Sequence, residues 1–147
     1  MPENDVIERA RRDAQEGKSP STQAGEFVRQ EIEHVRQGKH GARSPKQAIA
    51  IGLSKARRAG INLPPAKGSQ SSRKVRRRAE RDLSKGRSGR RKPSAKRSHA
   101  TSNALRRESR SAASHAALSR QAKSSARKRG PSSRRRAAAR AARTRRT

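Results

Sequence analysis

Apolar residues recur at helical spacing near the start of the chain. A first stripe predicts a helix over residues 3–15, with acids early in the helix and Gly17 as its stop. A second stripe follows Ser19 and Pro20 and predicts a helix over residues 21–37, ending at Gly38. The apolar positions of these two stripes are Val6, Ile7, Ala10 and Ala14, then Ala24, Phe27, Val28, Ile32 and Val35. Both helices are therefore expected to be amphipathic and to bury one face.

A third helix, predicted over residues 45–59, has the clearest boundaries. Ser44 is the expected N-cap, Pro45 suits the first helical position, and Gln47 completes a capping-box pattern. Gly60 is the expected C-terminal stop. The apolar face consists of Ala48, Ile49, Gly52, Leu53 and Ala56. Because this face is too small to stand alone, the helix should dock on the first two helices or on a partner, with Ile61 and Leu63 closing the base.

Beyond Pro65 the apolar pattern fades into Arg, Lys, Ser and Ala. Only 27% of the residues are hydrophobic and Phe27 is the single aromatic residue, a composition typical of disordered chains. The predicted fold class is mostly α with extensive disorder: a small helical N-terminal half (residues 1–65) and a disordered polycationic tail (residues 66–147). Helix propensity is present at residues 72–83, 103–129 and 134–146, where arginine repulsion is expected to prevent helix formation until phosphates relieve it.

Charge divides the two regions more sharply still. The N-terminal half carries 12 basic and 8 acidic side chains, a net +4, and the tail carries 29 basic and 3 acidic, a net +26, which together give the +30 of the chain. Such a chain repels itself, whereas a nucleic acid offers phosphates and a counterion cloud whose release drives binding. Arginines outnumber lysines 30 to 11, which favours bidentate phosphate contacts and insertion into narrow minor grooves. The charge therefore predicts a polyanionic partner.

The candidate nucleic-acid-binding residues are basic side chains in both regions. In the N-terminal half they are Lys39, Arg43, Lys46, Lys55, Arg57 and Arg58. In the tail they are Arg73, Lys74, Arg76, Arg77, Arg78, Arg90, Arg91, Lys92, Arg127, Lys128, Arg129, Arg134, Arg135 and Arg136. Single-strand readers stack bases on aromatic side chains, which this chain almost lacks. Duplex DNA or structured RNA, held through its backbone, is the expected ligand.

The residue types that catalysis and metal binding need are poorly placed. The absence of cysteine excludes disulfides, thiolate nucleophiles and cysteine-based zinc fingers. No serine lies in a Gly-x-Ser-x-Gly turn and no acid pair has an apolar pocket, so no enzyme activity is expected. Glu31, Glu33, His34 and His40 could share a metal, but the spacing matches no known ligand motif. A solvated helix face is the favoured interpretation, and neither a metal nor another cofactor is predicted.

Two short motifs have a structural and a functional interpretation. Gly17-Lys18-Ser19 resembles the end of a phosphate-binding loop, but Arg12 stands where that loop needs its first glycine, so a helix stop followed by a cap is favoured. Ser44-Pro45-Lys46 resembles the Ser-Pro-basic units that lie in the minor groove. Here, too, the helix cap is favoured, because Gln47 and Gly60 complete a helix signature.

The apolar runs of the sequence indicate where in the cell the protein is expected. No apolar run approaches the roughly 18 residues that would span a bilayer, and the acidic start of the chain has no apolar signal core behind it. An intracellular protein that does not enter the membrane is expected.

Much of the N-terminal half resembles a family of small basic bacterial proteins of uncharacterised domain type, some of which carry a plasmid-stabilisation label. The resemblance lies in residues 17–28 (GKSPSTQAGEFV), 32–34 (IEH), 38–44 (GKHGARS) and 46–60 (KQAIAIGLSKARRAG). It implies a bacterial cytoplasm and carries no site assignments. The tail is similar to the basic arms of linker-histone-like proteins in composition only.

Together these observations predict sequence-nonspecific nucleic-acid binding, as bacterial, nucleoid-associated DNA binding in an architectural or plasmid or chromosome maintenance role. One alternative is an RNA- or ribosome-associated basic protein whose extension threads among rRNA phosphates. A second is an interaction or stress protein in which the N-terminal helices recruit a protein partner and the tail only raises its local concentration.

Overall fold

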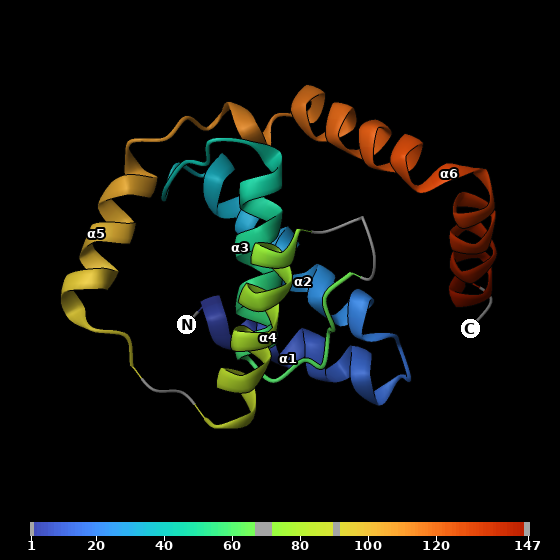
Figure 1. The fold of residues 1–147 in the computed structure, drawn as a ribbon, viewed down its shortest axis with the longest axis horizontal. Helices are drawn as coiled ribbons and strands as arrows, with labels where there is room; N and C mark the ends of the chain where they lie inside the picture. The colour runs from blue at the N-terminus through green and yellow to red at the C-terminus, as the bar shows by residue number, and fades with distance from the viewer. Residues whose placement is uncertain (1, 67–71, 90–91, 146–147) are drawn as a thin grey trace.

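The computed structural model describes residues 2–66, 72–89 and 92–145, and these residues form helices joined by short connections (Figure 1). No strand occurs within these ranges. In chain order the elements are α1 (Pro2–Gln15), α2 (Pro20–Arg36), α3 (Pro45–Arg58), α4 (Arg73–Arg87), α5 (Ala95–Arg106), the short 3-10 helix η2 (Ser111–Ala113) and α6 (His115–Arg145).

The three helices predicted in the N-terminal half are present within one or two residues of the predicted ends, and their caps explain this. The Ser19 hydroxyl accepts from the Thr22 amide and the Ser44 hydroxyl accepts from the Gln47 amide. The Gln47 side chain reaches back to the amide of Arg43, at 2.6 Å, rather than to that of Ser44. Gly17, Gly38 and Gly60 follow the helices with positive φ, the conformation in which glycine ends a helix without strain. Both short motifs therefore serve as helix boundaries, as expected.

The predicted small core lies where these helices meet. Phe27 is buried with residues of α1 and α3, and Ile61 and Leu63 pack against this cluster. α2 and α3 cross closely because Gly52 has no side chain: a Cβ there would meet the backbone of Val28. The exposed pair between Arg9 and Glu26, at 2.8 Å, links α1 to α2.

α4, the first helix of the tail, packs along α3 (Figure 1). Its Asp82 is 2% exposed and accepts hydrogen bonds from Ser54, at 2.7 Å, and Arg58, at 2.8 Å, both on α3. Gly86 permits close approach, since a Cβ at this position would meet the carbonyl oxygen of Arg57. A buried carboxylate and a glycine thus join the tail to the N-terminal half.

A second contact is made by residues 105–113, here called the docking segment. The amide of Gly41 donates to the carbonyl of Leu105, at 2.8 Å, and that of Ala42 donates to Ser109, at 3.0 Å. Ala112 and Ala113 are buried in a cluster completed by Val35, Ala42 and Ala48. The Arg36 side chain closes the contact by donating to the carbonyl of Ala113, at 3.0 Å. This segment therefore completes a second small core over the connection between α2 and α3.

α5 and α6 extend away from this body on either side of it (Figure 1). Neither helix has a buried residue, and α5 packs against no other element in the described ranges. α6 consists of two helical arms, residues 115–129 and 131–145, that meet at Gly130, whose φ is 75° and which Pro131 follows. Proline suits the first turn of the second arm, where its missing amide hydrogen leaves no helical bond unmade.

The prediction of an extensively disordered tail is therefore wrong. The helix propensity of the tail is realised in α4, α5 and α6 without a polyanion, although residues 107–114 between α5 and α6 are not α-helical. Serines again provide caps: Ser72, Ser94 and Ser114 accept from the amides of Val75, Arg97 and Ala117. Repulsion between the arginines does not prevent these helices from forming, because the exposed side chains lie in water, where charge interactions are strongly screened. Docking also needs little apolar surface, since alanines and glycines allow backbone-to-backbone contact.

Candidate nucleic-acid interface

Half of the cations predicted in the N-terminal half are engaged in the fold. Lys55 donates to Glu31 at 2.8 Å, and Arg58 donates to Asp82 at the same distance. Arg57 donates to the carbonyl of Leu63, at 2.8 Å, and burial lowers its pKa. These three side chains hold α3 against α2, α4 and the segment that follows α3. The sequence alone, which shows only a basic helix end, does not indicate this role.

The other three, Lys39, Arg43 and Lys46, are exposed around the connection between α2 and α3. The Arg43 side chain is 81% exposed and lies 3.8 Å from Glu108, next to the docking segment. An exposed pair at this distance contributes little to stability. These side chains therefore form a small basic surface at the place where the tail docks.

In the tail, α4 carries a row of exposed cations. Arg73, Lys74, Arg77 and Arg78 are exposed, and Arg76 is half-buried. Arg73, Arg77 and Arg81 stand four residues apart, so they follow one side of the helix, where with Lys74, Glu80 and Ser84 they line an open hollow. Such a row presents several positive charges in one direction.

The remaining predicted residues lie further along the tail. Lys92 is exposed just before α5. Arg90 and Arg91 lie outside the described residues. The other six, Arg127, Lys128, Arg129, Arg134, Arg135 and Arg136, are exposed on both sides of the Gly130 kink in α6. Among the described residues, the exposed predicted cations do not converge on one pocket; they are spread over α4, α6, the connection between α2 and α3, and the connection before α5.

The few carboxylates of the tail decide where its charge is neutralised. Of its three acids, Asp82 and Glu108 face Arg58 and Arg43 of the N-terminal half. Glu80 is exposed on α4, and from residue 109 to residue 147 the sequence contains no acid. The acids of the tail thus serve mainly its attachment, and α6 has no carboxylate of its own. Sequence reasoning missed Asp82 and the docking segment. The signal for Asp82 was weak, because Glu80 stands in the same basic run and is exposed.

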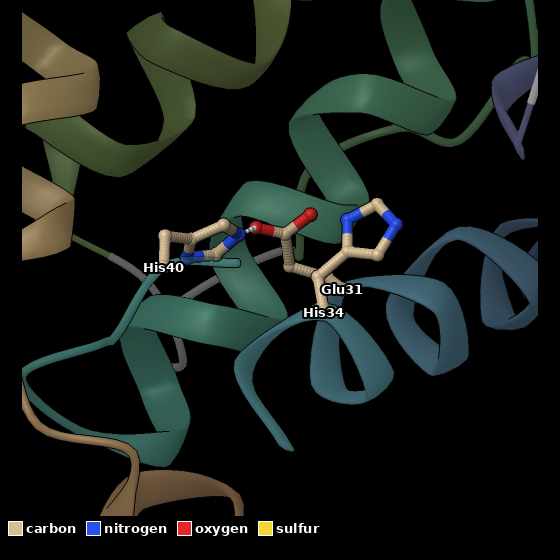
Figure 2. Close-up of side chains that lie close together, drawn as sticks. All are labelled: Glu31, His34 and His40. Atoms are coloured by element: carbon tan, nitrogen blue, oxygen red, sulfur yellow. Dashed lines mark ion pairs between the residues drawn. The ribbon is translucent and has the colours of Figure 1, made fainter. Parts of the chain in front are cut away.

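A separate polar cluster lies under the connection between α2 and α3. The Glu31 side chain is 1% exposed and touches Lys55 through Oε2 and His40 through Oε1, both at 2.8 Å. His34 stands one turn after Glu31, and Figure 2 shows the two imidazoles on either side of the Glu31 carboxylate. Glu33, which the sequence grouped with them, is exposed and accepts from Gln37 instead. The favoured interpretation of this group as a solvated helix face does not hold for Glu31.

The electrostatics of the Glu31–His34–His40 cluster favour a neutral His34. Burial lowers the pKa of His34, and the positive charges of Lys39 and Lys55 lower it further. His40 is held on its other side, where Nδ1 lies 2.9 Å from the carbonyl oxygen of Gly41. Each of the three residues offers one ligand atom, and these atoms lie within 4.8 Å of one another.

Over the described residues the protein is mostly helical, and its net charge of +30 makes it strongly cationic. No helix in the described ranges is long and apolar enough to cross a bilayer. A model of a family of unknown function, DUF6496, matches residues 15–67, which cover α2, α3 and the connections beside them. This match agrees with the resemblance to a domain of uncharacterised type. No curated protein and no solved structure matches the chain.

Proposed function

We propose that the protein binds nucleic acid through the phosphate backbone, without reading base sequence. The observation that supports this most is the surface of the tail, where exposed Arg and Lys side chains line α4 and both arms of α6 and no acid follows Glu108. A surface of one sign over this length attracts a polyanion and repels a second cationic protein.

The helices influence how such binding works. A cation on a formed helix has its backbone already ordered, so binding does not have to meet the ordering cost of about 1–2 kcal/mol per residue that a disordered chain would incur. The kink at Gly130 divides α6 into two straight basic arms. Two arms at an angle are suited to following a curved phosphate backbone, which a single straight helix would leave after a short distance.

The biological role that we propose is association with bacterial DNA in the nucleoid, as an architectural or plasmid or chromosome maintenance protein. The N-terminal half would hold the tail in place and add the basic surface formed by Lys39, Arg43 and Lys46. Exposed side chains that contact phosphates carry no sequence information, so this role requires no specific site on the DNA.

Salt dependence tests the mechanism. If about ten cations contact phosphates at once, the slope of log affinity against log salt is about −9, and raising salt from 50 to 200 mM weakens binding by about five orders of magnitude. Fluorescence anisotropy on two scrambled duplexes at four salt concentrations should give the same steep slope for both. A difference between the duplexes that survives high salt would contradict nonspecific binding.

The nature of the polyanion is tested in the cell. Pulldown of the full chain followed by nuclease treatment should release the associated material with DNase and not with RNase. Release by RNase alone would assign the protein to an RNA or ribosomal role. Retention of a protein partner after both treatments would support the interaction role instead.

A further inference from the structure

The buried Glu31 carboxylate has an unusual environment for its two oxygens. Oε2 accepts from the Lys55 ammonium at 2.8 Å. Oε1 is fully buried and is left without a hydrogen-bond donor unless His40 supplies one from Nε2, which lies 2.8 Å away. A buried carboxylate oxygen without a hydrogen-bond donor destabilises the fold. It therefore matters which nitrogens of the His40 ring carry a hydrogen.

The contact of the other ring nitrogen of His40, Nδ1, indicates where the hydrogen lies. Nδ1 lies 2.9 Å from the Gly41 carbonyl oxygen, which can only accept, so Nδ1 carries a hydrogen. In the neutral ring Nε2 then has a lone pair, and this lone pair faces Oε1 of Glu31. Two lone pairs at 2.8 Å repel each other, so the arrangement requires a positive species between them.

His34 indicates which positive species the site is built for. A proton between Glu31 and His40 would need no third group, yet His34 presents a ring nitrogen to the same carboxylate from the next turn of α2 (Figure 2). Two imidazoles and one carboxylate are a ligand set for Zn²⁺. Glu and His three residues apart on a helix also form the Glu-x-x-His arrangement with which helical bundles hold metals.

We propose that Glu31, His34 and His40 bind a divalent transition-metal ion, with Zn²⁺ as the expected occupant. Tetrahedral Zn²⁺ with bonds of about 2.0–2.1 Å separates its ligand atoms by about 3.3 Å. Glu31 Oε1 and His40 Nε2, now 2.8 Å apart, therefore have to separate slightly, and ligand atoms of the cluster that lie further apart, up to 4.8 Å, have to move closer. His34 and His40 each supply a ring nitrogen, and Glu31 supplies Oε1. A fourth position stays open to water.

The surroundings supply the outer contacts that metal ligands need. The hydrogen bond from His40 Nδ1 to the Gly41 carbonyl orients the ring, and that from Lys55 to Oε2 orients the carboxylate. The Lys55 charge opposes the metal charge and keeps the affinity moderate. Gly41 also donates to Leu105 of the docking segment, so metal binding would fasten the connection between α2 and α3 on which the tail docks.

Calorimetric titration of the full chain with Zn²⁺, in protein purified without a histidine tag and free of nucleic acid, tests this site. One Zn²⁺ per chain is expected, and Co²⁺ in its place should show the visible absorption of a tetrahedral ion. His34→Ala is the decisive variant, because it leaves the Glu31 contacts to Lys55 and His40 intact and should weaken Zn²⁺ binding at least about tenfold.

The matched control removes the two exposed histidines of the tail, His99 and His115, by substitution with Ala, and should leave the affinity unchanged. His40→Gln and Glu31→Gln should weaken binding as His34→Ala does, with circular dichroism checking that each variant keeps its helices. Two results would overturn the metal site: no stoichiometric Zn²⁺ binding by the unaltered chain, which would leave a proton between Glu31 and His40, or equal binding by His34→Ala. Neither result depends on whether the protein binds nucleic acid.

Discussion

The N-terminal half and the tail use charge in opposite ways. In residues 2–66 basic side chains find acids close by: Arg9 faces Glu26, Lys55 faces Glu31, and hydrogen bonds to Asp13 and Glu16 raise the pKa of Lys18. In the tail, Asp82 and Glu108 reach across to Arg58 and Arg43 of the N-terminal half. Charge in the first region maintains a fold, whereas charge in the second remains on the surface.

A chain with a net charge of +30 forms tertiary structure here because only a few of its residues have to make the contacts between regions. Attachment of the tail depends on a few contacts made by small or acidic residues, Asp82, Gly86 and the docking segment, which bury little apolar area. The cations on α5, which lies between these contacts, and on α6, which follows them, are exposed.

The largest effect is expected from Asp82→Ala. The substitution removes the buried acceptor of Ser54 and Arg58 and should destabilise the fold by about 2–3 kcal/mol, since hydrogen bonds to charged groups are the stronger ones. Urea unfolding followed by circular dichroism measures this. Glu80→Ala, at an exposed acid on the same helix, is the control and should change stability by less than about 0.5 kcal/mol. Equal effects of the two substitutions would mean that α4 is not fastened through Asp82.

A smaller loss is expected from Gly41→Ala. The new Cβ would meet the backbone of Glu108 and Ser109, so the docking segment must shift, at a cost of about 1–3 kcal/mol typical of overpacking. Amide exchange should show faster exchange at Gly41 and Ala42, whose amides donate to the docking segment. Unchanged exchange at Ala42 would show that the segment does not hold this connection.

Gly25→Ala provides the matched contrast within the N-terminal half. Gly25 lies inside α2, and a Cβ there would meet nothing within 4 Å. Alanine should therefore stabilise the helix by about 0.8–1 kcal/mol. The same chemical change is thus expected to act with opposite sign at positions 25 and 41, and thermal unfolding of both variants compares them directly. Destabilisation by Gly25→Ala would reveal a contact on this face of α2.

Local signals account for what could be predicted from the sequence. The ends of α1 to α3 could be predicted because serine N-caps and glycine stops affect the backbone only within a few residues. Ser19 and Ser44 cap the starts of α2 and α3, and a glycine with positive φ follows each of the three helices. The core around Phe27 followed from helical spacing. Helix propensity in the tail was visible too, but screening and serine caps decided that the helices form.

The contacts between distant residues could not be predicted. Ala112 and Ala113 stand in a Ser-Ala-Ala-Ser run without apolar periodicity, and their burial depends on Val35 and Ala48, which are far away in the sequence. Asp82 acquires its role from Ser54 and Arg58. Likewise, Lys55 meets Glu31 only after α2 and α3 have crossed. The residue type at these positions does not predict the contact, because the contact exists only once the fold has brought the two partners together.

Most of the phosphate contacts are expected from the exposed charge of the tail, with Lys39, Arg43 and Lys46 as the contribution of the N-terminal half. Two triple variants lower the charge equally on exposed helical positions: Arg134, Arg135 and Arg136 of α6 to Gln, and Arg11, Arg12 and Arg29 of α1 and α2 to Gln. The decisive measurement is the salt dependence of duplex affinity for both. The tail variant should make the slope of log affinity against log salt shallower by up to about 2.7, at about 0.9 per contact, while the N-terminal variant should keep the slope of the unaltered protein. Equal changes in the two, or a larger change in the N-terminal variant, would contradict the account.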